Sequence, residues 1–142
     1  MKLAKEKLTS QSQMYTADIS RWTDNILAEL NIYAKAIDEG TFRNDDQILQ
    51  YLETSMGLND AYPNGIYLGD DSGVYLDGSG WVPDSDWVLT ERDWYLEGKD
   101  HETIAFGAPY FDSLSKQMCV SASVRLQDSD VIRVMPVWTA FT

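Results

Sequence analysis

One long amphipathic helix near the N-terminus constrains the fold of this chain more than any other feature. Across residues 8–38 the large apolar side chains recur every three or four positions, so they form one continuous stripe on a helix; they are Ile19, Trp22, Ile26, Leu30, Tyr33 and Ile37. Gly40 follows the last turn, as is typical of a residue that ends a helix. The stripe predicts a helix packed on a core. A seam between two copies of the helix is the alternative, because the same spacing suits helix pairs.

Two shorter helices are expected further along the chain. Asn44 is placed to cap the first of them, with Gln47 at the capping-box position three residues later. The second is expected at residues 91–98, where Thr90 or Asp93 is placed to cap it.

The remaining ordered segments have the composition of strands. Alternating and β-branched runs between turn residues predict strands at residues 66–68, 74–76, 103–111, 117–126 and from 131. The last strand is expected to end at Pro136 or to lie at a sheet edge, because proline cannot donate to a ladder. Helices segregated from consecutive strands favour an α+β fold, with the long N-terminal helix packed on a mostly antiparallel, five-stranded sheet. We expect one structural domain, divided into the helical segment 1–43 and a sheet-bearing module over residues 44–142.

The chain is strongly acidic, with a net charge of −12. Residues 60–112 hold twelve acidic residues and only two basic ones, Arg92 and Lys99. Such a surface repels nucleic acid and anionic lipid headgroups, so neither is expected as a partner. No apolar run approaches the length of a transmembrane helix, and no signal-peptide pattern opens the chain.

Several residue types that often carry chemistry have simple interpretations in this sequence. Cys119 is the one cysteine, so no internal disulfide is expected, and it suits a small buried position in a strand. His101 is the one histidine and is expected at a solvated loop position. Neither a metal nor another cofactor is expected, because a transition-metal site needs several such ligands. The acidic segments that begin at Asp70 and Asp77 lack the terminal acid of a calcium loop and are expected to be turns.

The clearest signal of a binding site is an arginine among aromatic residues. The residues concerned are Trp87, Arg92, Trp94, Tyr95, Tyr110 and Asp112. The fork of the arginine matches a carboxylate, the aromatic side chains provide apolar walls with polar edges, and an aspartate accepts hydrogen bonds from an ammonium group. Together they suit a small zwitterion such as an amino acid. The alternative is a structural ion pair between Arg92 and Asp112 beneath an aromatic cluster.

The spacing of these residues resembles the ligand-binding motif of double Cache (dCache) domains. These are extracytoplasmic sensor domains of bacterial chemoreceptors, histidine kinases and cyclic-dinucleotide enzymes. The motif has an aromatic residue five positions before an arginine, then Arg-x-Trp-Tyr, then Tyr-x-Asp, and the amino-acid-binding branch of the family is the most similar. Residues 64–69 also resemble the family's first strand, and residues 108–112 resemble the start of its PYxD strand. Over about residues 15–135 the chain resembles the membrane-distal, PAS-like half of such a domain.

This resemblance implies a sensor rather than an enzyme. The chain would be the extracytoplasmic part, periplasmic or cell-surface, of a bacterial transmembrane signalling receptor. Its output would be chemotaxis, phosphorylation or cyclic-dinucleotide synthesis. The resemblance assigns the carboxylate clamp to Arg92, its positioning to Trp94 and Tyr95, the pocket walls to Trp87 and Tyr110, and the ammonium contact to Asp112.

Three further expectations come from the resemblance. The family carries a second aspartate after its fifth strand, where this chain has Thr139, so we expect either weaker binding of amino acids than a full site gives or a preference for ligands without a free amine. The chain is expected to be a fragment without its flanking membrane helices, which would be its only contact with a membrane. The fragment lacks the local concentration that those helices would provide. We therefore expect at most weak dimerisation of the fragment through its N-terminal helix.

Two other functions are compatible with the residues alone. A small hydrolase would use carboxylates of the acidic loop, which are Asp84, Asp86 or Asp112. A self-associating structural module would be built on the apolar stripe of the long helix.

Overall fold

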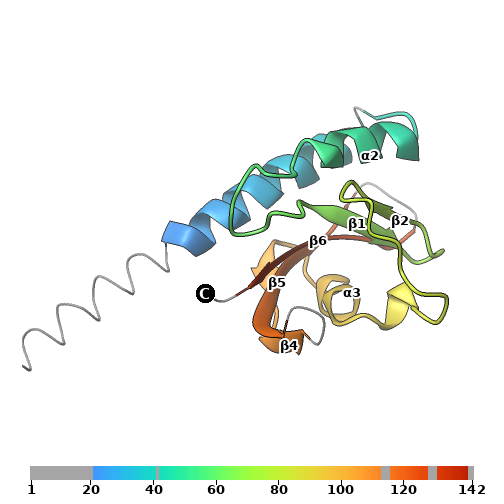
Figure 1. Ribbon diagram of the computed structural model, residues 1–142. Helices are drawn as coiled ribbons and strands as arrows, with labels where there is room; N and C mark the ends of the chain where they lie inside the picture. Colours follow the sequence, from blue (N-terminus) through green and yellow to red (C-terminus); the bar gives the residue numbers. More distant parts are fainter. Residues whose placement is uncertain (1–20, 41, 113–115, 128–130, 141–142) are drawn as a thin grey trace, which may run out of the picture.

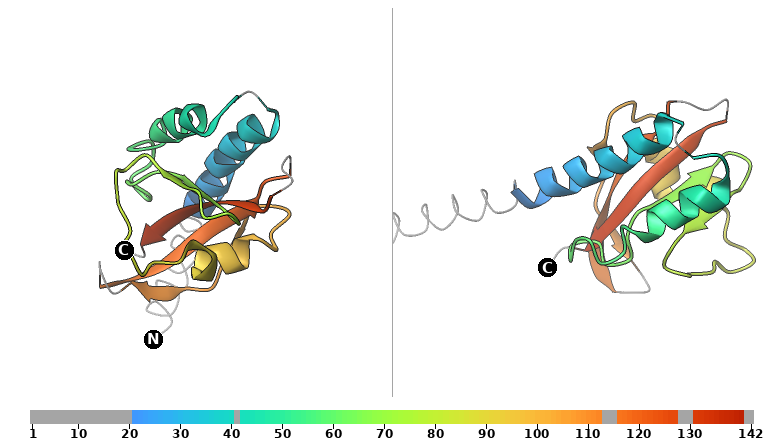
Figure 2. Two further views of the ribbon diagram at one scale, coloured as in Figure 1. Left: turned by 90° about the vertical axis from the view of Figure 1, so that its right-hand side faces the viewer. Right: turned by 90° about the horizontal axis from the view of Figure 1, so that it is seen from above.

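A six-stranded antiparallel sheet lies between two layers of helix (Figures 1 and 2). The computed structural model describes residues 21–40, 42–112, 116–127 and 131–140. Residues 21–38 are helical, and the other elements are α2 (Asp45–Glu53), β1 (Tyr67–Asp70), β2 (Tyr75–Asp77), the 3-10 helix η1 (Leu89–Glu91), α3 (Asp93–Gly98), β3 (Ala105–Phe106), β4 (Tyr110–Asp112), β5 (Gln117–Arg125) and β6 (Arg133–Ala140). The predicted α+β class and the antiparallel, PAS-like sheet are confirmed.

The apolar stripe of the N-terminal helix forms the core. Ile26 and Leu30 are fully buried, and Tyr33 and Ile37 are nearly so. They pack with α2 and with apolar side chains of β5 and β6, including Val124. Gly40 has φ +73°, the left-handed conformation expected after a last helical turn. The core role of the stripe is therefore confirmed for residues 21–38, whereas residues 8–20, Ile19 included, lie outside the described part of the chain.

Capping bonds explain where α2 begins. The side-chain oxygen of Asn44 accepts from the backbone N–H of Gln47 at 2.9 Å, as predicted. The reciprocal bond differs from a standard capping box, because the side chain of Gln47 accepts from the backbone N–H of Arg43 at 2.7 Å rather than from that of Asn44. These two bonds join the residues just before α2 to its first turn.

The strand order is β2-β1-β6-β5-β3, and β4 also pairs with β5. The single strand expected at residues 103–111 is split into β3 and β4, which raises the number of strands in the described sheet from five to six. Gly107 lies in the gap and its N–H donates to the carbonyl of Ser121. The chain therefore stays attached to β5 while it bends around Pro109.

The prediction that the last strand ends at Pro136 or lies at an edge is wrong. β6 continues to Ala140 and is central, between β1 and β5. Its ladder to β5 passes through the Ser123–Pro136 pair without a break. Its ladder to β1 covers Asp70–Arg133 and Gly69–Val134 and resumes only as an isolated bridge between Ile66 and Val137. A residue without an N–H is accommodated because β1 does not pair with it.

The register sorts the strand residues onto two faces of the sheet. Side chains of directly paired residues lie on the same face, and the face alternates along each strand. The face covered by the N-terminal helix and α2 is apolar. The opposite face, here called the α3 face, carries mostly polar and aromatic residues, which are Tyr67, Tyr75, Asp77, Tyr110, Asp112, Gln117, Ser121, Ser123, Arg125 and Trp138.

Close contacts fix α3 against this second face. A Cβ added at Gly98 would lie 2.4 Å from a methyl carbon of Val134, and one added at Gly69 would lie 2.7 Å from the ring of Trp94. Both glycines therefore permit an approach of α3 to the sheet that any side chain would block. Among the helices in the described ranges, none combines the length and the apolar character that a membrane span requires.

Candidate functional site

An aromatic cluster beside α3 brings together two of the predicted site residues. The ring of Trp94 contacts Tyr67 edge-on, with centroids 5.3 Å apart, and that of Trp87 contacts Tyr75 at 5.1 Å. Trp81 completes the cluster, 5.9 Å from Tyr75 and 5.5 Å from Trp87. Edge-to-face packing of this kind adds to the energy of burial and holds the rings in fixed orientations.

Arg92 is an exposed cation at the border of this cluster. It links η1 to α3, with φ −74° and ψ 144°. Its N–H donates to the carbonyl of Leu89, which closes the 3-10 turn, and no side chain caps α3. The predicted caps Thr90 and Asp93 are therefore wrong: the intervening 3-10 turn moves the first α-helical residue to Asp93, so that the capping position falls on Arg92.

The guanidinium of Arg92 has no hydrogen-bonding or ion-pair partner in the described part of the chain. The alternative of a structural ion pair with Asp112 is therefore wrong. The positive charge nevertheless lies near Tyr67, where it opposes the rise in the pKa of that phenol. An arginine whose donors are all available, beside a wall of fixed rings, is suited to a planar anion such as a carboxylate.

Tyr110 and Asp112 lie together on the α3 face. They are two residues apart in β4, opposite Cys119 and Gln117 of β5. The hydroxyl groups of Tyr110 and Ser121 are 3.3 Å apart. Burial raises the pKa of Tyr110, the bond with Ser121 opposes that rise, and nearby charges, among them those of Asp112 and Asp93, add to it. Tyr110 also acts on the pKa of Tyr67, so the two phenols face a common region.

Tyr95 contacts Trp94 edge-on, with centroids 6.1 Å apart, but its hydroxyl is bonded at the β1–β2 turn. It is buried, and its hydroxyl donates to Asp71 at 3.2 Å, at the turn after β1. Burial, followed by the charge of Asp71, raises its pKa. Of the six predicted residues, four lie near Tyr67 or Tyr75, which are Trp87, Arg92, Trp94 and Tyr110. Asp112 lies near Tyr110, whereas the hydroxyl of Tyr95 connects α3 to the β1–β2 turn.

Sequence reasoning missed Tyr67, Tyr75 and Asp77. The hydroxyl of Tyr75 donates to Asp77 at 2.6 Å, and burial together with this bond raises the pKa of Tyr75. Burial, Tyr110 and Asp77 raise the pKa of Tyr67 well above its usual value. The signal that was available is the two-residue spacing, which places Tyr67 with Gly69, and Tyr75 with Asp77, on single faces of the predicted strands.

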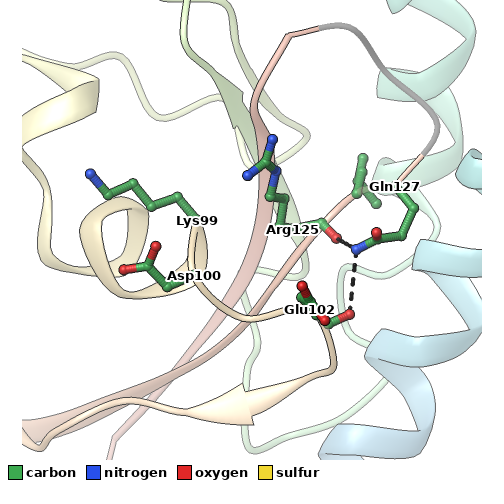
Figure 3. Close-up of a pocket in the computed structure, with 6 residues that line it drawn as sticks. Lys99, Asp100, Glu102, Arg125 and Gln127 are labelled. Atoms are coloured by element: carbon green, nitrogen blue, oxygen red, sulfur yellow. Dashed lines mark hydrogen bonds between the residues drawn. The ribbon is translucent and has the colours of Figure 1, made fainter.

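Two surface cavities lie elsewhere. One, of about 330 Å³, is lined by residues of both charges and is shown in Figure 3; these are Lys99, Asp100, Glu102, Arg125, Leu126 and Gln127. The side chain of Gln127 crosses its floor, donating to the carbonyls of Arg125 at 2.9 Å and of Glu102. The other, of about 460 Å³, lies between Trp22 and Trp138 at the end of β6. Neither is lined by any of the six predicted residues.

Other predictions can be placed on the fold. Asp70 forms a turn by accepting from the N–H groups of Ser72 and Val74, and Asp77 does so by accepting from that of Ser79, so the interpretation of both segments as turns is confirmed. Cys119 is fully buried in β5, as predicted. In the ranges that the structure describes, no three His, Cys, Asp or Glu side chains are grouped to hold a metal.

His101 and Thr139 differ from expectation. His101 is half-buried rather than solvated, because its Nδ1 lies 3.1 Å from the hydroxyl of Ser123. Thr139 faces the N-terminal helix layer and donates its hydroxyl to the carbonyl of Ala61. It cannot be the counterpart of an aspartate on the α3 face, because β6 extends through it and alternation turns it to the opposite side. The exposed carboxylates of Asp84 and Asp86 lie on the loop before η1.

Comparison with solved structures identifies the fold. The ligand-binding domain of the Pseudomonas fluorescens chemoreceptor CtaA, in complex with L-alanine, is similar with a TM-score of 0.77 and 16% identity over 95% of this chain. The ligand-binding domain of the Pseudomonas aeruginosa amino-acid chemoreceptor PctC, in complex with GABA, is similar with a TM-score of 0.72 and 15% identity over 88% of this chain. The ligand-binding domain of the Campylobacter jejuni chemoreceptor Tlp3, in complex with 4-methylisoleucine, is similar with a TM-score of 0.65 and 19% identity over 87% of this chain.

This chain spans only part of those domains, covering 59%, 56% and 53% of the three chains respectively. No protein-family model and no curated protein matches the sequence. The fold implied by the dCache resemblance is therefore confirmed by structure, at a level of identity that shows the fold alone.

Proposed function

We propose that this chain is a ligand-binding sensor module of a bacterial transmembrane receptor and that it binds a small amino acid or related carboxylate on the α3 face. The observation that carries the proposal is Arg92, an exposed guanidinium without a partner in the described ranges, near Tyr67 of the aromatic cluster. Its fork of donors is therefore available to a planar anion such as a carboxylate. The fold shared with ligand-binding domains of chemoreceptors supports the same reading.

Each residue of the site would have a distinct task. Arg92 would clamp the ligand carboxylate through two parallel hydrogen bonds. Trp94 and Trp87 would exclude water on one side, and Tyr110 would do so on the other. Asp112, on the same face as Tyr110, would accept from an ammonium group. Tyr95 would act indirectly, by holding α3 to the turn after β1 through its bond to Asp71.

The module would lie outside the cytoplasm and would signal without catalysing a reaction. Residues 1–43 would form the helical segment that carries the signal, and residues 44–142 the sensor module. Ligand binding can change the receptor only by favouring one of two arrangements for which its affinity differs. The N-terminal helix is the part that would respond, because it packs on the sheet directly behind the site (Figure 2).

A thermal-shift screen followed by calorimetry tests this proposal. The chain would be heated with single amino acids, short carboxylates and amines, and a ligand at 100 times its Kd should stabilise it by about 2.7 kcal/mol. Calorimetry with each hit would then compare the wild type with Arg92→Ala and with Arg43→Ala, which removes the same charge from an exposed position on the other side of the sheet. Binding that is lost only in Arg92→Ala supports the proposal. A screen without hits, or a ligand indifferent to Arg92→Ala, contradicts it.

A further inference from the structure

Asp77 stands at the edge of the candidate site that lies opposite β4. It is the direct partner of Tyr67 across the β1–β2 ladder, so its side chain lies on the α3 face. It is half-buried although it is charged. Asp77, Arg92 and Tyr110 all lie near enough to Tyr67 to act on its pKa.

The orientation of the Asp77 carboxylate is fixed by two bonds. One oxygen accepts from the hydroxyl of Tyr75 at 2.6 Å and the other from the backbone N–H of Ser79 at 2.9 Å. Tyr75 is itself held between Trp81 and Trp87. An ionised carboxylate can accept about four hydrogen bonds, so each oxygen retains a free lone pair in this fixed orientation.

Resting on the function proposed above, we propose that Asp77 is a second anionic anchor of the site and binds a cationic group of the ligand. A carboxylate paired with Tyr67 across the ladder and an arginine near the same tyrosine form a dipolar site, which matches a molecule with a carboxylate at one end and an ammonium at the other. Two carboxylates, of Asp77 and Asp112, and two arginines, Arg92 and Arg125, lie on this face or at its border. The nearness of Asp77 and Arg92 to one tyrosine therefore favours zwitterionic amino compounds over molecules with one sign of charge.

Tyr75 is a positioning residue in this scheme. It does not reach the ligand but holds the Asp77 carboxylate toward the α3 face through the 2.6 Å bond. Removing its hydroxyl leaves the charge of Asp77 in place and frees its rotation. The loss of affinity should therefore have the same ligand dependence as the loss caused by changing Asp77 itself, and it should be smaller.

The experiment compares matched ligands on matched variants by calorimetry. The ligands are an amino acid that binds the wild type and its analogue with a hydroxyl in place of the amino group. The variants are Asp77→Asn, Tyr75→Phe and Asp84→Asn, the last of which removes an equal charge from the exposed loop. Asp77→Asn should weaken the amino acid at least about tenfold, the value of one charged hydrogen bond, and leave the hydroxy analogue unchanged. Tyr75→Phe should shift the same ratio by a smaller factor, and Asp84→Asn should not shift it.

A purely structural Asp77 would affect both ligands equally, and that result overturns the inference, as does an unchanged ratio in Asp77→Asn. Thermal melts of each variant separate misfolding from loss of contact, and Tyr75→Phe gives a second reading should Asp77→Asn fold poorly. If the wild type binds neither ligand and no other amino compound, the proposed function fails and the inference fails with it. Amino-acid binding that depends on Arg92 but not on Asp77 overturns the inference alone.

Discussion

The side chain of Arg92 shows how much of the candidate site depends on one residue. The donors of its guanidinium are unused within the described ranges, and Tyr67, on whose pKa its charge acts, cannot replace a carboxylate. Replacement by alanine should cost about 2–5 kcal/mol of binding free energy, as for truncation of one partner in a buried charge pair. Replacement by lysine keeps the charge and loses the fork, so it should recover only part of that loss. Calorimetry in which Arg92→Lys binds as tightly as the wild type would contradict the bidentate clamp.

Tyr67 and Tyr75 make the stability of the fold depend on alkaline pH. Burial raises the pKa of both phenols in the folded state, whereas the unfolded chain releases these protons near the usual value of 10.0. Stability should therefore be constant below about pH 10 and fall above it, by about 1.4 kcal/mol per pH unit for each tyrosine still protonated in the fold. Urea unfolding from about pH 8 to about pH 11 measures this decline, and Tyr75→Phe should make it shallower. A decline as steep as that of the wild type would show that Tyr75 titrates normally.

At the scale of single elements, α2 begins where Asn44 accepts the N–H of Gln47. Asn44→Ala should lower the free energy of unfolding by about 1 kcal/mol, because a donor in the first turn loses its partner. Asn31→Ala is the control, since Asn31 is an exposed residue in the middle of the N-terminal helix and alanine favours a helix there. Chemical denaturation of both variants checks the prediction. Equal effects would mean that the cap contributes nothing beyond propensity.

The close packing of α3 against the sheet is the second feature at the scale of single elements. A Cβ at Gly69 would lie 2.7 Å from Trp94 and 2.8 Å from Leu89, both of which are buried. Gly69→Ala should therefore push α3 and η1 outward and cost about 1–3 kcal/mol of stability. Gly69→Ala combined with Leu89→Ala should lose less than the two single changes added together, because the second change makes room for the first. Additive losses in denaturation experiments would mean that the two residues do not share this contact.

Local signals predicted the elements better than they predicted their neighbours. The 3.6-residue stripe and the side chain of Asn44 act within one helix, so the sequence was sufficient for both. The course of β6 through Pro136 depends on whether β1 pairs there, which no local pattern specifies. The face of Thr139 depends on the same pairing, because only the continuation of β6 to Ala140 decides to which side of the sheet that residue points.

The same distinction applies to the candidate site. The segment from Trp87 to Tyr95 is contiguous, so its aromatic and cationic character is visible in the sequence. Asp77 joins it only through the register between β1 and β2 and through the edge-to-face contact of Tyr75 with Trp87. Such contacts are set by tertiary packing. In the sequence, the strand residues that make them show only the alternation of polar and apolar residues that any half-buried strand has.

For the whole molecule, the open question is self-association. The buried side of the N-terminal helix serves the core, and its largest apolar residue left outside is Ile32, at 60% exposure. One such side chain is a small contact area, so we expect at most weak, concentration-dependent dimerisation. Sedimentation from micromolar to near-millimolar protein measures it, with Ile32→Lys as the variant that should abolish it. A tight dimer that survives Ile32→Lys would locate the interface elsewhere.

The interruption of backbone pairing at Pro136 divides the sheet mechanically. The ladder between β1 and β6 is the sparse one, whereas β5 and β6 are bonded along their whole shared length. Tyr67, Tyr75 and Asp77 belong to the β1–β2 hairpin on one side of this seam, and Tyr110 and Asp112 belong to the strands on the other. A ligand that contacts residues of both groups links the β1–β2 hairpin to the strands on the other side of this gap in pairing. Part of its binding free energy then fixes the orientation of the hairpin relative to the rest of the sheet. The N-terminal helix packs against both parts.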